Sequence, residues 1–176
     1  MQIRYDIRED DLSGEETRAL LALHLQGMHA SSPPGTVFAL DLTGLTVPEV
    51  TVWTAWRDGR VASIGALKML PDGNAEVKSM RTHPDFLKMG AGAAILEHII
   101  AEARRRGVRR LSLETGSGPA FEPSLALYRR RGFVDGEAFS DYRPGEFSQF
   151  LHLPLAEPAQ AARGSALVQP ASNRTR

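Results

Sequence analysis

The first half of the chain carries the period of β-strands. Residues 2–8 alternate strictly between apolar and polar side chains, which indicates a strand with one buried face. Asp58-Gly59 is a dipeptide favoured in tight hairpin turns, and residues 71–74 form a second turn signal. The segments flanking these turns are therefore predicted to pair as an antiparallel meander. The strands predicted from this pattern are residues 2–8, 50–57, 60–70 and 75–82.

Helical periods flank this meander. Residues 91–106 bring an apolar stripe to one face, and Gly107 stands where such a helix ends. A leucine-rich stripe also runs through residues 15–29, after an acidic first turn. Residues 36–48 fit neither period. The remaining predicted elements are a helix at 123–131 and strands at 109–114, 133–134 and 147–153.

Together these elements predict an α/β fold of the α+β type. The strand at 75–82, the helix at 91–106 and the strand at 109–114 form one parallel βαβ unit. The other strands pair antiparallel, so we expect one central mixed sheet of six to seven strands with helices on both faces. The length suits a single domain, placed at residues 1–155. Residues 156–176 lack an apolar period and are expected to form a flexible tail.

Composition and charge exclude several classes of function. The 176 residues carry 21 basic and 21 acidic side chains, so no bulk charge draws the protein to nucleic acid or to an anionic membrane. Cysteine is absent, which excludes disulfides and a thiol relay and fits a reducing compartment. No signal-peptide pattern or membrane-length apolar run is present, so we expect a cytoplasmic protein. The five histidines show no ligand spacing, and no metal site is predicted.

The small residues that open the helix at 91–106 are the first candidate for chemistry. The first amides of a helix have no internal partner, and the run from Gly90 to Ala93 lets a phosphate approach them, with Lys88 nearby. Small residues here also suit plain packing of the helix against the sheet, so both interpretations stay open. A P-loop is excluded because Ala93-Ala94 follows Gly92. A dinucleotide fingerprint is disfavoured because Ile95 stands where its third glycine belongs.

Three further pieces follow one another at a specific spacing. They are the strand 75–82 with His83-Pro84, the loop Leu87-Lys88-Met89-Gly90-Ala91-Gly92, and the segment Leu127-Tyr128-Arg129-Arg130-Arg131-Gly132-Phe133. In this order they resemble the GNAT acetyltransferases, and the resemblance covers roughly residues 1–155. The chain is also similar to a bacterial subgroup that carries Leu-Glu-Thr-Gly-Ser, here 113–117, and Ala-Leu-Asp-Leu, here 39–42.

The resemblance implies acetyl-CoA as co-substrate. In the family, backbone amides of the glycine loop bind the pyrophosphate of coenzyme A, the edge of the preceding strand binds the pantetheine arm, and a tyrosine lies near the thioester sulfur. The loop residues implied here are Lys88, Met89, Gly90, Ala91, Gly92 and Ala93. The strand backbones are those of Met80 and Thr82, and the tyrosine is Tyr128. Two positions depart from the family pattern, since Leu87 replaces an Arg or Gln and Phe121 replaces an Asn.

Acetyl transfer to an amine requires a base, because a lysine-like amine with a pKa of about 10.4 is protonated at neutral pH. We predict Glu76 as that base, since its strand runs beside the expected thioester. The alternative is that Glu76 is solvated or pairs with Lys78 or Lys68. Direct transfer needs no metal and no covalent enzyme intermediate.

Two other groups complete the predicted chemistry. Tyr128 is predicted to protonate the departing thiolate, and the backbone amide of Met80 to stabilise the oxyanion. The alternative for Tyr128 is a packed aromatic ring with a satisfied hydroxyl group. Glu114 and Glu122 either recognise a cationic acceptor or only cap and solvate.

The predicted function is therefore transfer of an acetyl group from acetyl-CoA to the amine of a small molecule or peptide. The main alternative is a coenzyme A-binding sensor without turnover, which Leu87 and Phe121 leave open. A weaker alternative is a dinucleotide-binding module. The family resemblance also makes a homodimer an expectation.

Overall fold

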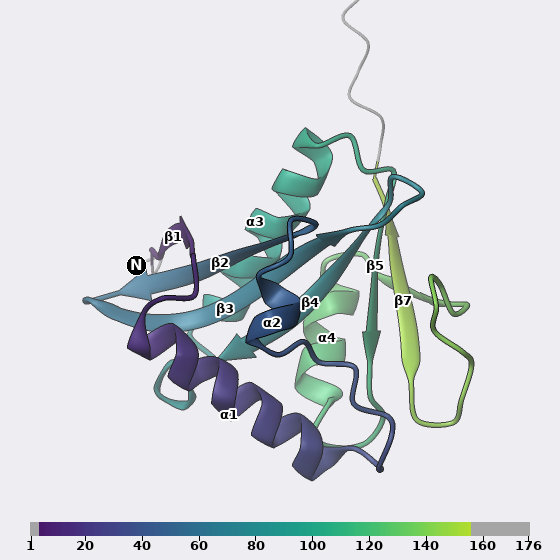
Figure 1. The fold of residues 1–176 in the computed structure, drawn as a ribbon, viewed down its shortest axis with the longest axis horizontal. Helices are drawn as coiled ribbons and strands as arrows, with labels where there is room; N and C mark the ends of the chain where they lie inside the picture. Colours follow the sequence, from purple (N-terminus) through teal and green to yellow (C-terminus); the bar gives the residue numbers. More distant parts are fainter. Residues whose placement is uncertain (1–3, 156–176) are drawn as a thin grey trace, which may run out of the picture.

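The computed structural model describes residues 4–155, which form one seven-stranded mixed sheet with helices on both faces (Figure 1). The helices are α1 (Glu15–Ser31), α2 (Leu42–Leu45), α3 (Ala91–Arg105) and α4 (Glu122–Arg130), with a 3₁₀ turn at Pro84–Phe86. The strands are β1 (Asp6–Glu9), β2 (Val50–Arg57), β3 (Arg60–Met69), β4 (Ala75–Thr82), β5 (Arg110–Thr115), β6 (Val134–Gly136) and β7 (Gln149–Pro154). The tail predicted at 156–176 lies outside the described residues.

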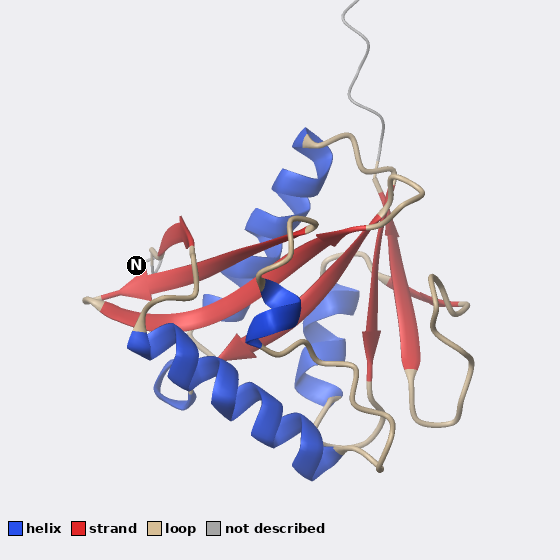
Figure 2. Cartoon of the chain, in the orientation of Figure 1, coloured by secondary structure: helices blue, strands red, loops and turns tan. Residues whose placement is uncertain are grey.

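The predicted fold class is confirmed. Strand order is β1-β2-β3-β4-β5-β7-β6, and only β4 and β5 pair in parallel, joined through α3. Helices α1 and α2 cover one face of the sheet and α3 and α4 the other (Figure 2). The stretch 36–48, which fitted neither period, contains the single turn α2, capped by the Asp41 side chain accepting from the Gly44 amide at 2.9 Å.

Each face of the sheet has its own apolar core. The stripe of α3 buries Ile95, Leu96 and Ile99 completely against the sheet, together with Leu125 of α4. On the other face, Leu20 of α1 packs with residues of β2 and β3. Each such side chain stabilises the fold by roughly 1.5–3 kcal/mol through burial, so both helix layers are held firmly against the strands between them.

A β-bulge in β4 shapes the centre of the sheet. The register between β3 and β4 shifts between Ile64 and Ala66, so that Gly65 stands opposite both Ser79 and Met80. Ser79 takes a left-handed conformation with φ of 55°. A bulge bends its strand and increases the local twist.

β4 separates from β5 after Glu76, shortly before the bulge. The two strands pair only at Ala75 with Leu111 and at Glu76 with Ser112, while β5 continues beside β7 as far as Thr115. The second half of β4 therefore has a free edge on the β5 side.

The bulge depends on the absence of a side chain at position 65. A Cβ added to Gly65 would lie 2.5 Å from Ile95 Cγ2, 2.6 Å from Met80 Sδ and 2.9 Å from Ile99 Cδ1. We expect Gly65→Ala to lower the free energy of unfolding by about 1–3 kcal/mol, as overpacking of a core does. Urea unfolding measures this change.

The matched control is Gly145→Ala, because a Cβ at Gly145 meets no atom within 4 Å. This control should stay within about 0.5 kcal/mol of the wild type. Equal stability of Gly65→Ala and the wild type would contradict the close packing at the bulge.

Candidate functional site

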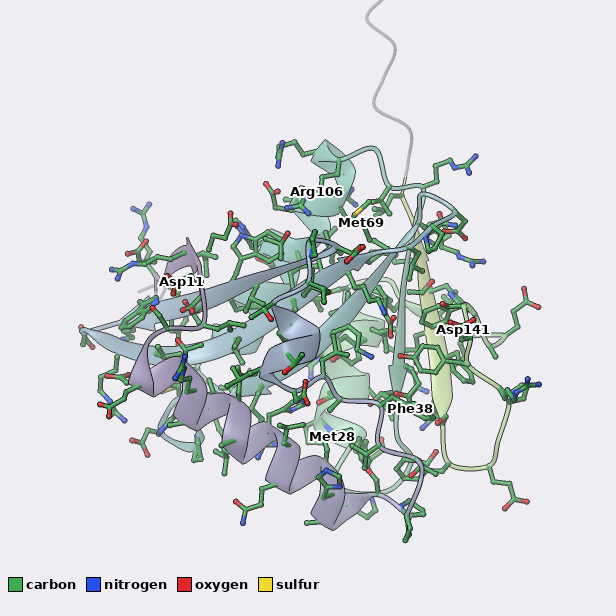
Figure 3. The ribbon with its side chains drawn as sticks, in the orientation of Figure 1. Asp11, Met28, Phe38, Met69, Arg106 and Asp141 are labelled. Carbon is green, nitrogen blue, oxygen red and sulfur yellow. The ribbon has the colours of Figure 1, made fainter. Side chains whose placement is uncertain are left out.

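A cavity of about 330 Å³ opens where β4 and β5 diverge. Its walls come from α1, the connection after it, β4, β5 and the start of α4. They are His24, Gly27, Met28, Ser31, Phe38, Ala39, Val77, Lys78, Ser79, Met80, Arg81, Glu114, Thr115, Ala120, Phe121, Ser124 and Tyr128. Figure 3 labels two of them, Met28 on α1 and Phe38 in the connection that follows. The volume suits a small molecule.

The predicted glycine loop lies at the open start of α3. Gly90 is the N-cap residue with φ of 84°, and no side chain caps the helix. A Cβ at Gly90 would meet no atom within 4 Å, so the space in front of the first amides is clear. These amides have no partner inside the helix, and the helix dipole favours an anion beside them. The geometry therefore fits the pyrophosphate of coenzyme A.

Gly92 supports the second interpretation of the glycines, which is close packing of α3 against the sheet. A Cβ there would lie 3.0 Å from Thr82 Oγ1, so glycine lets α3 approach β4. Lys88 is exposed and also left-handed, with φ of 58°. Ala91 is buried, while Gly92 and Ala93 are partly exposed. The loop thus combines an open anion site at its tip with tight packing one turn further on.

A hydrogen bond that the sequence did not predict fixes the loop to the start of the chain. The Tyr5 hydroxyl donates to the Met89 carbonyl at 2.9 Å, across 84 positions in the chain. Phe86 packs with Ala62 and Ala91 in a small apolar cluster. No local sequence pattern predicts this contact, because Tyr5 and the loop come together only once the strands have paired in the sheet.

The predicted pantetheine edge is the free side of β4. Met80 lies in the bulge and lines the cavity, and Thr82 stands two residues further toward the loop. Thr82 Oγ1 lies 3.1 Å from Ser63 Oγ and close to Gly92. The cavity lining ends at Arg81, so Thr82 and residues 88–93 lie just beyond it, along the same strand edge.

Tyr128 reaches the cavity from α4. Its side chain is 7% exposed, and its ring packs at 5.9 Å from the ring of Phe133. Burial raises the pKa of Tyr128 well above its ordinary value, and the charge of Glu114 raises it further. The hydroxyl group therefore stays protonated at neutral pH, the state that a proton donor needs.

The structure places Glu76 beneath the cavity, outside its lining. Glu76 is 2% exposed, and its Oε1 accepts hydrogen bonds from the Tyr142 hydroxyl at 2.5 Å and from Lys78 Nζ at 3.3 Å. Lys78 also donates to the Phe38 carbonyl at 2.9 Å and to the Tyr142 hydroxyl at 2.8 Å. Glu76 thus belongs to a buried cluster that joins β4 to the segments containing Phe38 and Tyr142, and the pair with Lys78 is the alternative that the sequence left open.

The carboxylate that lines the cavity is Glu114 of β5. Burial raises its pKa above the ordinary value, and the charge of Glu76 adds to this, while a hydrogen bond from Ser148 and the charge of Lys78 oppose it. Glu114 faces the same space as Tyr128. The sequence singled out Glu114 for acceptor recognition, but the alternation of side chains along β5 could not place it beside Tyr128. Glu122, named with it, does not line the cavity.

Leu87 and Phe121, the two positions that depart from the family pattern, differ in their exposure to solvent. Leu87 is 58% exposed. Phe121 is buried, lines the cavity and packs edge-on against Phe147 at 5.5 Å. Phe121 therefore supplies apolar wall where the family pattern has an amide side chain.

Within residues 4–155, no three His, Cys, Asp or Glu side chains lie together in a way that could hold a metal ion. No helix in this part of the chain has the length and apolar character needed to cross a membrane.

Comparison with known proteins agrees with this geometry. Residues 11–133 match the model of the Acetyltransferase (GNAT) family. The chain is 45% identical over 153 residues to an uncharacterized N-acetyltransferase, YedL, of Escherichia coli K12, covering 87% of this chain and 96% of that protein. It is similar to the solved structure of a Klebsiella pneumoniae protein assigned as an acyl-CoA N-acyltransferase, with a TM-score of 0.70, 26% identity and coverage of 86% and 98%.

A second solved structure is the Bacillus subtilis acetyltransferase in complex with CoA. It has a TM-score of 0.65 and 18% identity, and the match covers 87% of this chain and all of that one. At this identity the likeness concerns the fold. The family match and the long similarity to a named N-acetyltransferase establish that this chain belongs to the GNAT family of acetyltransferases and is an acyltransferase.

Proposed function

We propose that this enzyme transfers an acetyl group from acetyl-CoA to the amine of a small molecule or a peptide end. One observation carries the proposal. The cavity at the divergence of β4 and β5 brings a carboxylate, Glu114, and a protonated tyrosine, Tyr128, to one space, at the end of a strand edge that leads to the open start of α3. Acetyl-CoA supplies the activated acetyl thioester.

The residues that would hold acetyl-CoA follow from the same edge. The amides of residues 88–93 would bind the pyrophosphate, and the backbones of Met80 and Thr82 would bond to the pantetheine arm. The charge of Lys88 adds to the attraction for phosphate at the loop. The Met80 amide, in the bulge, is the proposed donor to the oxyanion.

Glu114 is the proposed base, which changes the assignment made from the sequence. A base must reach the proton that it removes, directly or through one water. Glu114 lines the cavity, whereas Glu76 lies below it and already accepts from Tyr142 and Lys78. We assign Glu76 a positioning role, since it holds the Lys78 ammonium group and the Tyr142 hydroxyl in place.

Tyr128 is the proposed acid. It is placed to donate a proton to the departing thiolate, because it lines the cavity and holds its hydroxyl proton at neutral pH. The alternative of a sensor without turnover shares the binding residues but gives Glu114 and Tyr128 no chemical task. The two functions therefore differ in what these side chains do, and not in cofactor binding.

The loop assignment is tested by Gly90→Glu. A carboxylate at this position repels the pyrophosphate, so we expect loss of acetyl-CoA binding, at least about 100-fold in Kd by calorimetry. Gly107→Glu is the matched control, because Gly107 lies at the other end of α3 with the same left-handed backbone and an open Cβ position. Both variants carry similar backbone strain. Equal losses in the two variants would contradict the loop assignment.

The function itself is tested by release of free coenzyme A in a thiol assay with a panel of amines. We expect turnover by the wild type and a loss of roughly 100-fold in kcat in Tyr128→Phe, the low end for a general acid, because a thiolate with a pKa of about 8.5 is a tolerable leaving group. The Kd of acetyl-CoA should stay unchanged. Tight cofactor binding with no turnover of any amine would favour the sensor.

The base is tested by the pH dependence of kcat/KM in Glu114→Gln and Glu76→Gln. In the wild type, kcat/KM rises with pH as Glu114 loses its proton, at a pH above the ordinary carboxyl range because its pKa is raised. In Glu114→Gln, this rise of kcat/KM at acidic pH (the acidic limb) should disappear. The value of kcat/KM should fall roughly 100-fold. Its melting temperature should stay equal or rise, because burying the ionised carboxylate disfavours folding at neutral pH.

Glu76→Gln should behave in the opposite way. It should lower the melting temperature, because it leaves the buried Lys78 ammonium group without its counter-charge. Its acidic limb should remain. If Glu76→Gln lost the limb and Glu114→Gln kept it, Glu76 would be the base.

A further inference from the structure

The cavity contains a guanidinium group without a partner. Arg81 extends from β4 after the bulge, on the side of α1, where a Cβ at Gly27 would lie 3.0 Å from its Nη1. Among the described residues, no carboxylate lies within 4.0 Å of Arg81 and no group accepts a hydrogen bond from its side chain. Lys78, the neighbouring cation, is fully engaged with Glu76, Tyr142 and Phe38. Arg81 is therefore the free cation of the cavity.

A buried polar group next to it is also unpaired. His24 of α1 lines the cavity and is 7% exposed, and its Nδ1 has no hydrogen-bond partner within the described chain. Burial, with the charges of Arg81 and Lys78 adding to it, lowers its pKa to about 4. At neutral pH the ring is uncharged and offers one N–H donor. Six such buried side-chain atoms occur in the described chain, and two of them, His24 Nδ1 and Ser79 Oγ, belong to residues that line the cavity.

These groups specify the chemistry of what binds beside them. A guanidinium group is a planar fork that pairs with a carboxylate through two parallel hydrogen bonds. Arg81 is half-buried and has no carboxylate of the described residues beside it. The position of a paired carboxylate is therefore available to a ligand. The cations also disfavour a second positive charge on the acceptor, because like charges in a cavity repel strongly.

The opposite charge in the cavity lies on the next strand. Glu114 of β5 lines the same space as Arg81 of β4, and the divergence of the two strands separates them. A molecule that satisfies both has an amine directed to Glu114 and an anion directed to Arg81. Met28, Phe38 and Phe121 provide apolar wall for the part between or beside these groups.

We propose that the acceptor is a small amine that also carries a carboxylate, of the amino-acid type, with its carboxylate held by Arg81. This inference rests on the proposed acetyl transfer. Glu114 takes one proton from the ammonium group of the acceptor, and the amine nitrogen then bonds to the acetyl carbon as the carbon–sulfur bond breaks. The sulfur receives the Tyr128 proton, and the second proton released from nitrogen returns to Tyr128. The carboxylate is unchanged. A cavity of about 330 Å³ suits a free molecule better than a side chain on a folded protein.

The test compares L-amino acids with their α-carboxamides, and with amines that lack the carboxylate, in the thiol-release assay. We expect kcat/KM for at least one amino acid to exceed that for its carboxamide by about 10-fold or more in the wild type. In Arg81→Gln this ratio should fall close to one, and Arg81→Lys should recover part of it. Peptides with a free carboxyl end form a separate arm, and turnover confined to them would overturn the proposal of a small acceptor.

Two further variants separate recognition from folding. Gly27→Ala places a methyl group against the Arg81 guanidinium group while favouring the helix by up to about 1 kcal/mol, so KM for the amino acid should rise without a lower melting temperature. Arg104→Gln removes an exposed arginine of α3, far from the cavity lining, and should leave the ratio unchanged.

The outcomes distinguish this inference from the proposed function. Turnover of amines with no carboxylate preference, or a preference that Arg81→Gln leaves intact, would overturn the inference and leave acetyl transfer standing. A weaker Kd for acetyl-CoA in Arg81→Gln with an unchanged acceptor ratio would assign Arg81 to the cofactor. Without any turnover, calorimetry with the same pairs on the coenzyme A complex still decides, because loss of amino-acid binding in Arg81→Gln supports the carboxylate site and equal binding contradicts it.

Discussion

The separation of β4 from β5 is the constraint on which the rest of this structure depends. Two parallel strands paired along their whole length would bury both backbone edges in hydrogen bonds and leave no room between them. The bulge opposite Gly65 bends β4 after two paired residues, so the strand keeps a free edge on one side and its pairing with β3 on the other. One local irregularity thus provides the cavity, the strand edge and the route from both to the start of α3.

A second organising feature is the buried charge of Lys78. A buried ammonium group needs partners, and here they come from three parts of the chain: Glu76 on the same strand, the Phe38 carbonyl after α1, and the Tyr142 hydroxyl before β7. Burial raises the pKa of Tyr142, and the charge of Glu76 adds to this, so its hydroxyl stays a donor. The cluster fixes two long connections against the sheet, and the first of them forms part of the cavity wall through Phe38 and Ala39.

The distribution of charge within the cavity then assigns the roles. Glu114 is the accessible carboxylate because Glu76 is committed to Lys78 and Tyr142. Arg81 is the accessible cation because Lys78 is committed to Glu76. The buried cluster therefore leaves one group of each sign to face a ligand. Tyr128, from the opposite face of the sheet, completes the site through the gap between the strands.

The sequence by itself determined the order and type of the elements, with most bounds within one or two residues, whereas the first strand, predicted at 2–8, is observed at Asp6–Glu9. These features depend on local periods, turn residues and spacing, which act within a few residues of the chain. It predicted Glu76 as the base and Glu114 as a contact of the acceptor, although alternation places both on the same side of neighbouring strands. Only the tertiary structure shows that Glu114 lines the cavity and Glu76 does not, because this depends on where the strands diverge and on Tyr142, which lies 66 positions from Glu76. Contacts across such distances leave no local pattern, and they are the contacts that determine which buried charges are satisfied and which are left for a ligand.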